Sequence, residues 1–218
     1  MNLPNKIELI HSIVLIGNFN PTVFQPVWLK DTGLLSEPDS EATQIKVIHP
    51  EVAELEADWF HLIVTRDRFS IRTKLESHHE SLRDLVLGTF KILESTPLRQ
   101  LGINFLGDFG PYESERWHGI GDLLAPKEKW REILNSPGLF NLQIKSLKEN
   151  DEDGFIITTL QPSKTNPNSI HIDLNDHYQL KDLEKPISAT EIISMLNEKW
   201  GTSVENSLKI INNILSWI

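Results

Sequence analysis

Residues 7–35 read IELIHSIVLIGNFNPTVFQPVWLKDTGLL, and this stretch decides the fold. Eight of the residues from Ile7 to Phe19 are apolar. An apolar run that is bounded by glycine is typical of a strand buried on both faces. Asn20 and Pro21 then place a helix-capping residue before a proline at the first helical position. The stretch therefore predicts a core strand that turns sharply into a helix.

The turn after this strand matches the opening of one catalytic signature. Residues 17–21 read GNFNP, like the start of the G-x-F-[DN]-P-x-H-x-G-H signature of nucleotidylyltransferases. That chemistry uses two histidines to stabilise phosphates, and the aligned positions are Val23 and Pro26, whose side chains cannot donate a hydrogen bond. Gln25 also replaces the expected glycine. We therefore interpret the motif as a capped turn.

Composition excludes several classes of protein. The chain has 31 acidic and 21 basic residues, a net charge of −10, which opposes attraction to nucleic acid and to anionic lipid. It has no cysteine, and thus no disulfide, thiol nucleophile or thiolate metal site. No basic segment precedes the first apolar run, and no apolar run approaches the roughly 20 residues of a membrane span. We predict a cytoplasmic protein without nucleic-acid or membrane partners.

The rest of the chain mixes strand and helix patterns. β-rich runs predict hairpins over residues 59–75 and 139–160, and a strand over residues 98–110. One apolar stripe predicts a helix that packs on the sheet; its residues are Leu82, Leu85, Val86, Phe90 and Leu93. This order predicts an α+β protein with mixed or antiparallel sheets packed by helices, and with a helical C-terminus.

The chain is long enough for one large domain. We treat residues 1–218 as a single α+β domain, with residues 1–110 and 111–218 as two sheet-and-helix halves that are fused in it. No internal sequence similarity supports a true repeat.

The C-terminal helices suggest an interface. Thr190 opens one helix that ends at Gly201, and Thr202 with Glu205 forms a capping box for a second. The second helix carries an apolar stripe that covers about half of its circumference. We expect a second layer or a second subunit to cover this stripe, and the predicted interface residues are Val204, Leu208, Ile211, Ile214, Leu215, Trp217 and Ile218.

A small-ligand pocket is the alternative to that interface. It would lie at the strand-to-helix turn of residues 18–21, because such turns hold ligands in many α/β proteins. The residues predicted to form it are Asn18, Asn20, Trp28, Phe105 and Trp117.

Acid and histidine residues suggest a third site. His171 and Asp173 alternate with apolar residues, which places both on one face of a strand. With Glu54 or Glu56 they would suit a metal-dependent hydrolase, but no nucleophile accompanies them, and exposed strand residues are the simpler explanation. We predict no catalytic residue, no metal and no cofactor.

Three features resemble a known family. Residues 100–107 read QLGINFLG, residues 172–174 read IDL, and a long helical tail follows. This order resembles a sporadically distributed, uncharacterised family of bacterial proteins, whose middle strand reads Arg-apolar-Gly-apolar-Arg-aromatic-apolar-Asn and whose late strand carries I-D-[ILV]. The glycine and the aromatic residue are kept, but the three polar positions are not. The resemblance implies a bacterial protein carried by mobile or anti-phage defence loci.

Together these patterns predict a non-catalytic protein-binding or assembly subunit of a bacterial intracellular complex, one that is defence-associated if the resemblance holds. It would contact another protein or a second copy of itself through the C-terminal helix or an open sheet edge. The small-ligand-binding domain is the alternative, and the metal-dependent hydrolase ranks third.

Overall fold

The computed structural model describes residues 3–148, 151–180 and 188–218. Its strands form one nine-stranded sheet in the order β2-β3-β4-β5-β1-β6-β9-β8-β7, and each neighbouring pair is antiparallel. This confirms the α+β prediction. The strands are β1 (Lys6–Gly17), β2 (Gln44–His49), β3 (Val52–Glu56), β4 (His61–Thr65), β5 (Arg68–Thr73), β6 (Leu98–Phe109), β7 (Leu142–Lys148), β8 (Asp151–Pro162) and β9 (Ile170–Gln179).

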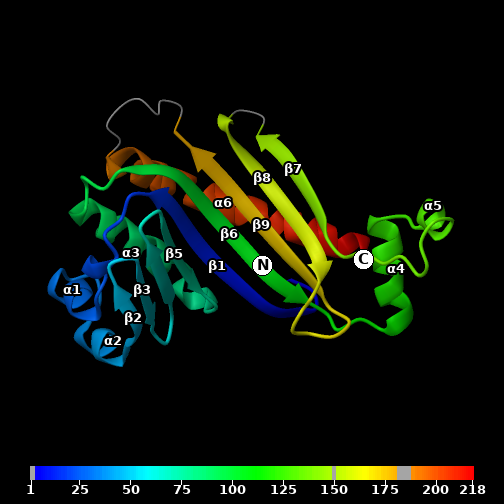
Figure 1. The fold of residues 1–218 in the computed structure, drawn as a ribbon, viewed down its shortest axis with the longest axis horizontal. Coiled ribbons are helices and arrows are strands. Elements are labelled where there is room, and N and C mark those ends of the chain that lie inside the picture. Colours follow the sequence, from blue (N-terminus) through cyan, green and yellow to red (C-terminus); the bar gives the residue numbers. More distant parts are fainter. Residues whose placement is uncertain (1–2, 149–150, 181–187) are drawn as a thin grey trace.

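Two long helices, α3 and α6, pack against each other on one face of the sheet. Figure 1 shows α6 crossing behind the long strands, while no helix of the described chain lies over the front of β1, β6 and β9. Short helices gather at the two ends of the molecule, α1 and α2 at one and α4 and α5 at the other. The helical segments are η1 (Pro21–Val23), α1 (Pro26–Asp31), α2 (Glu37–Ala42), η2 (Glu76–His78), α3 (His79–Ile92), α4 (Ser114–Leu124), α5 (Glu128–Arg131) and α6 (Ala189–Trp217).

Strand β1 lies in the middle of the sheet and is a core strand, as predicted. Ile13 and Leu15 point toward the helices and are fully buried. Ser12 and Val14 alternate with them and therefore point to the opposite face, yet they are also buried. No helix of the described chain lies over that face, and both residues line a hollow there. The open face of the sheet is thus built partly from buried groups.

The turn after β1 also forms as the sequence predicts. The Asn20 side chain accepts a hydrogen bond from the Thr22 backbone N–H at 3.3 Å, and Pro21 occupies the first position of η1. This short helix packs on β2 and β3 at the far end of the sheet. The cap is local, because Asn20 and its partner are two residues apart.

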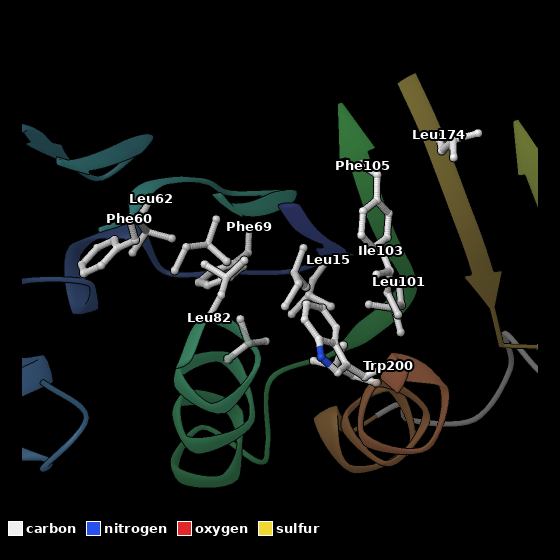
Figure 2. Close-up of a cluster of buried hydrophobic side chains, with 14 of the residues drawn as sticks. Leu15, Phe60, Leu62, Phe69, Leu82, Leu101, Ile103, Phe105, Leu174 and Trp200 are labelled. Carbon is white, nitrogen blue, oxygen red and sulfur yellow. The ribbon is translucent and has the colours of Figure 1, made fainter. Parts of the chain in front are cut away.

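Helix α6 differs from the two helices predicted at the C-terminus. It runs without interruption through Gly201, over 29 residues. Trp200 lies just before that glycine and is 2 % exposed, and Figure 2 shows its ring among Leu15, Leu101 and Ile103 of the sheet. A glycine in a helix costs about 1 kcal/mol relative to alanine. Burial of apolar side chains on both sides of Gly201 outweighs that cost and keeps the helix continuous.

Gly17→Ala is expected to destabilise the fold by about 1–3 kcal/mol, the usual cost of overpacking. A Cβ atom at residue 17 would lie 2.3 Å from the backbone oxygen of Pro97, which cannot move aside as a side chain does. Gly119→Ala in α4 is the matched control, because its Cβ would meet no atom within 4 Å. Alanine at residue 119 should raise the free energy of unfolding by up to about 1 kcal/mol, because glycine is unfavourable inside a helix. Urea unfolding of both variants checks this, and equal stabilities would contradict it.

Candidate functional site

An apolar surface lies at the end of the molecule that carries α4, α5 and β7. Large apolar side chains are exposed there, most of all Phe140 at 86 % and Ile133 at 72 %, and others follow along β7, where Leu147 is 75 % exposed. Figure 1 shows the C-terminus at the same end, where Trp217 is 60 % exposed. We name this region the α4–β7 surface; its residues are Leu123, Trp130, Ile133, Leu134, Phe140, Ile144, Leu147 and Trp217. Exposed apolar side chains on neighbouring elements mark candidate interaction sites.

The edge strand β7 runs through this surface. It is the last strand in the sheet order and, within the described residues, pairs with β8 alone. Its residues from Gln143 to Leu147 are all exposed. One side of β7 therefore presents unpaired backbone N–H and C=O groups to solvent, a template on which another strand can pair.

A cavity of about 320 Å³ lies beside the α4–β7 surface, between α4 and the ends of β8 and β9. Trp117, Leu139 and Pro162 contribute to its wall. Lys127 also lines it, but its Nζ atom already donates to the backbone oxygens of Gly121 and Ala125. The cavity therefore joins an apolar wall to a polar one, where Asp122 and Arg131 also lie and pair with each other.

The charge of this end differs from that of the whole chain. Between residues 114 and 148 there are six basic and four acidic residues, whereas the whole chain carries −10. Strand β7 contains Lys145 and Lys148 and no acidic residue. The α4–β7 surface is thus mildly basic on an acidic protein.

Three of the seven residues predicted as an interface on the C-terminal helix lie in the core. Ile211, Ile214 and Leu215 are at most 6 % exposed, because α6 packs on β6, β9 and α3. These three belong to the core and cannot contact a partner in this conformation. Val204, Leu208 and Ile218 are half-buried, which leaves Trp217 as the exposed member of the set.

The structure does not assemble the ligand pocket predicted at residues 18–21. Phe105 is fully buried on the helix side of the sheet, where its ring lies 4.4 Å from that of His11. Trp28 lies on α1 and Trp117 on α4, at opposite ends of the molecule (Figure 1). Asn18 is exposed, and Asn20 caps η1. These residues therefore lie on elements that face different ways, and the structure does not bring them together.

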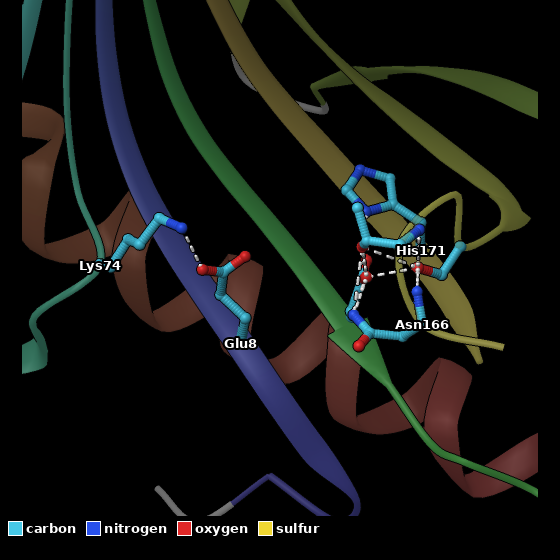
Figure 3. Close-up of polar contacts among 7 residues, drawn as sticks. Glu8, Lys74, Asn166 and His171 are labelled. Carbon is cyan, nitrogen blue, oxygen red and sulfur yellow. Dashed lines mark hydrogen bonds and ion pairs between the residues drawn. The ribbon is translucent and has the colours of Figure 1, made fainter.

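His171 of the predicted acid/base pair contacts Asp108 rather than Asp173. Its Nδ1 atom lies 2.6 Å from Asp108 Oδ1. Asp108 Oδ2 accepts hydrogen bonds from Ser163, Thr165 and Asn166. Figure 3 shows His171 and Asn166 in this cluster, well apart from the Glu8–Lys74 ion pair of the same sheet face. The cluster closes the loop between β8 and β9 onto the end of β6.

The environments of the two aspartates shift their pKa values in opposite directions. Burial acts to raise the pKa of Asp108, but hydrogen bonds from Ser163, Asn166 and His171 lower it below its ordinary value. Burial raises the pKa of Asp173, and the charge of His171 only partly opposes that rise. Asp108 is therefore a structural acceptor that stays ionised, while Asp173 faces a poorly hydrated part of the open sheet face.

The glutamates of the hydrolase hypothesis lie far from these residues. Strand β3, which carries Glu54 and Glu56, is five strands away from β9 in the sheet order, a separation of about 24 Å at ~4.8 Å per strand. Glu54 pairs with His61 and Glu56 with Lys46, each at 2.8 Å. The residues that the structure describes contain no group of three or more His, Cys, Asp or Glu residues fit to hold a metal ion. The structure therefore does not bring the predicted hydrolase residues together.

Sequence reasoning missed Asp108 and the α4–β7 surface. Asp108 lies opposite His171 in the β6–β9 register although 63 residues separate them. The α4–β7 surface carried a signal, the apolar residues on both sides of Pro137–Gly138, but their pattern alone does not show whether the core covers them.

The fold and these surfaces define an antiparallel α+β protein with one open sheet face and an apolar end. Comparison of the chain with models of protein families and with curated proteins finds no match. The resemblance to the sporadically distributed bacterial family therefore stays a prediction. Over the ranges that the structure describes, every helix is too short or too polar to cross a membrane.

Proposed function

We propose that this protein is a non-catalytic protein-binding subunit that holds its partner on the α4–β7 surface. The observation that carries this proposal is the outer edge of β7, which has no strand partner among the described residues and carries exposed apolar side chains. Natural sheet proteins protect such edges by covering or pairing them. A partner that covers this edge would remove both the free backbone groups and the apolar side chains from water.

The occupant that fits is an extended segment of another protein, with acidic and apolar side chains, added to the sheet as a further strand. Strand addition draws its affinity from backbone hydrogen bonds and its specificity from alternating side chains. Lys145 of β7 is exposed and favours an acidic partner, whereas Lys148 is half-buried and already pairs with Asp176 at 2.5 Å. Lys145 disfavours a second copy, because antiparallel pairing of β7 with itself about its centre would bring two Lys145 side chains together.

The neighbouring cavity supplies an anchor point for that segment. Its volume of about 320 Å³ suits one large apolar side chain, and Trp117 and Leu139 would pack on it. Interfaces commonly draw most of their energy from a few such buried anchors. A bacterial defence system as the setting of the complex follows from the sequence resemblance alone and stays a prediction.

The test compares Leu147→Glu and Phe140→Glu with Leu75→Glu. Leu75 is also exposed, at 43 %, but it lies between β5 and η2, outside the α4–β7 surface. Purified full-length protein would be incubated with extract of the source cells, and bound proteins would be crosslinked and mapped. We expect the first two variants to lose a partner crosslinked to β7, with affinity lower by about ten-fold or more. Leu75→Glu should retain it.

Equal retention by all three variants would overturn the proposal. Light scattering of the purified chain provides the second readout. A concentration-dependent dimer that Leu147→Glu abolishes would identify the occupant as a second copy and contradict the acidic partner.

A further inference from the structure

A polar groove runs across the open face of the sheet, opposite α6. The register places Arg72 of β5 beside Ser12 of β1, then Asn104 of β6, then Asn175 of β9. Two hollows of about 280 and 210 Å³ lie on this face, and both are lined by Val14, Arg68, Asn104 and Asn175. From Arg72 to Asn175 the groove crosses three strand spacings, about 14 Å.

Several polar groups in this groove lack partners among the described residues. The side-chain oxygens of Asn104 and Asn175 are buried and accept no hydrogen bond. Native structures rarely leave such groups unpaired, and each exception calls for a water, an ion or a ligand. These two amides lie on neighbouring strands directly opposite each other, so one bound group can contact both.

Two arginines form the cationic wall of the groove. Arg68 and Arg72 project from β5, and neither has a carboxylate within ion-pair distance among the described residues. Arg72 Nε donates to His61 Nδ1 at 3.1 Å, which leaves its terminal nitrogens for another acceptor. A guanidinium group binds carboxylate and phosphate oxygens in a planar, two-point geometry.

Gly102 provides a hollow in the floor between these groups. It lies between Val14 and His177 in the register, and a Cβ atom there would come 3.3 Å from the amide oxygens of both Asn104 and Asn175. Without a side chain at residue 102, a flat group can approach the backbone and the two amides together. His177 lines the same hollow, and its ring stacks on Phe155 at 4.3 Å.

We propose that this groove binds a small organic anion. Its phosphate or carboxylate group contacts Arg68 and Arg72, and its planar, hydrogen-bonding remainder lies over Gly102 against Asn104 and Asn175. Asp173 lines the other wall, where it can accept a hydrogen bond from the ligand. This site is separate from the α4–β7 surface, so one can exist without the other.

Calorimetric titration of the full chain with inorganic phosphate, citrate and adenosine monophosphate tests the site and separates phosphate from carboxylate ligands. We expect at least one probe to bind, and the double variant Arg68→Gln/Arg72→Gln to weaken it by about ten-fold or more, since each lost contact is charge-assisted. Asn175→Asp should also weaken it, because the new carboxylate repels the anion with little change in volume. Arg66→Gln is the control, as Arg66 is 62 % exposed and pairs with Glu51 at 2.6 Å.

Side-chain amide NMR signals of Asn104 and Asn175 localise the binding. Shifts of these signals by a probe, absent in the double variant, would support the site even if that variant were less stable. Absence of binding by all three probes at millimolar concentration, or equal binding by the wild-type and double-variant proteins, would overturn the proposal.

Discussion

Acidification from pH 7 to pH 5 should lower the free energy of unfolding by about 2 kcal/mol through His11 alone. His11 is 1 % exposed, and its ring stacks on that of His79 at 3.1 Å. Neither ring nitrogen of His11 has a hydrogen-bond partner in the described chain. Burial first, and then the charges of His79 and Lys6, lower the pKa of His11 from 6.5 to about 2. The folded protein therefore excludes a proton that the unfolded chain accepts.

The sign of the effect follows from that difference. Above pH 6.5 His11 is neutral in both the folded and the unfolded state, and its contribution to the free energy of unfolding is complete. Below pH 6.5 only the unfolded state takes up the proton, so that contribution is lost. Burial lowers the pKa of His79 and of His177 as well, and both act in the same direction. Asp173 acts in the opposite direction, because its raised pKa favours the folded state as the pH falls.

Urea unfolding at pH 7, 6 and 5 measures this dependence, with His11→Phe as the matched variant. Phenylalanine keeps a ring between His79 and Phe105 but cannot be protonated. We expect the free energy of unfolding of the variant to fall by about 1 kcal/mol less per pH unit than that of the wild type over this range. If the free energy of unfolding of the two proteins fell equally with pH, His11 would accept a proton in the folded protein, and the prediction would be wrong.

Trp200→Ala should destabilise the fold by about 3–5 kcal/mol, the usual cost of removing a buried aromatic side chain. Its ring fills the space between α6 and the sheet (Figure 2), and its Nε1 atom donates to Glu80 Oε1 of α3 at 2.9 Å. The substitution therefore leaves a cavity at the junction of both helices and the sheet. Thermal and urea unfolding give the measurement.

Trp217→Ala is the control for that experiment, since it removes the same side chain from the same helix. Trp217 is 60 % exposed, so its loss should change stability by no more than about 0.5 kcal/mol. It belongs to the α4–β7 surface, so the variant also probes partner binding without loss of fold. A similar loss of stability in both variants would mean that the end of α6 is as firmly packed as its middle.

Features that depend on neighbouring residues could be predicted from the sequence. The cap at Asn20 links it to Thr22, and the apolar stripe of α3 buries Leu82, Leu85, Val86 and Phe90 as its spacing predicts. The core strand over residues 7–17 follows from a run of apolar side chains in the same way. These features depend on a hydrogen bond between residues two apart or on a helical period. Both involve only residues that are close together in the sequence.

Which surface covers an apolar stripe was not predictable, and the C-terminal helix shows why. Periodicity indicates that Ile211, Ile214 and Leu215 lie on one face of the helix. The protein's own sheet and a second subunit would both exclude water from that face, so the sequence does not show which of them covers it. The structure covers them with β6, β9 and α3, and leaves the apolar residues around α4, α5 and β7 exposed instead.

By itself the sequence determined the class of fold, the central strand with its capped turn, and the amphipathic helices, because these depend on periodicity and on short-range hydrogen bonds. Only the tertiary structure decided the strand register that joins Asp108 to His171 and lines Arg72, Asn104 and Asn175 along one groove. Strand pairing brings together residues that are far apart in the chain. A shift of one residue in register would turn each of these side chains to the other face of the sheet.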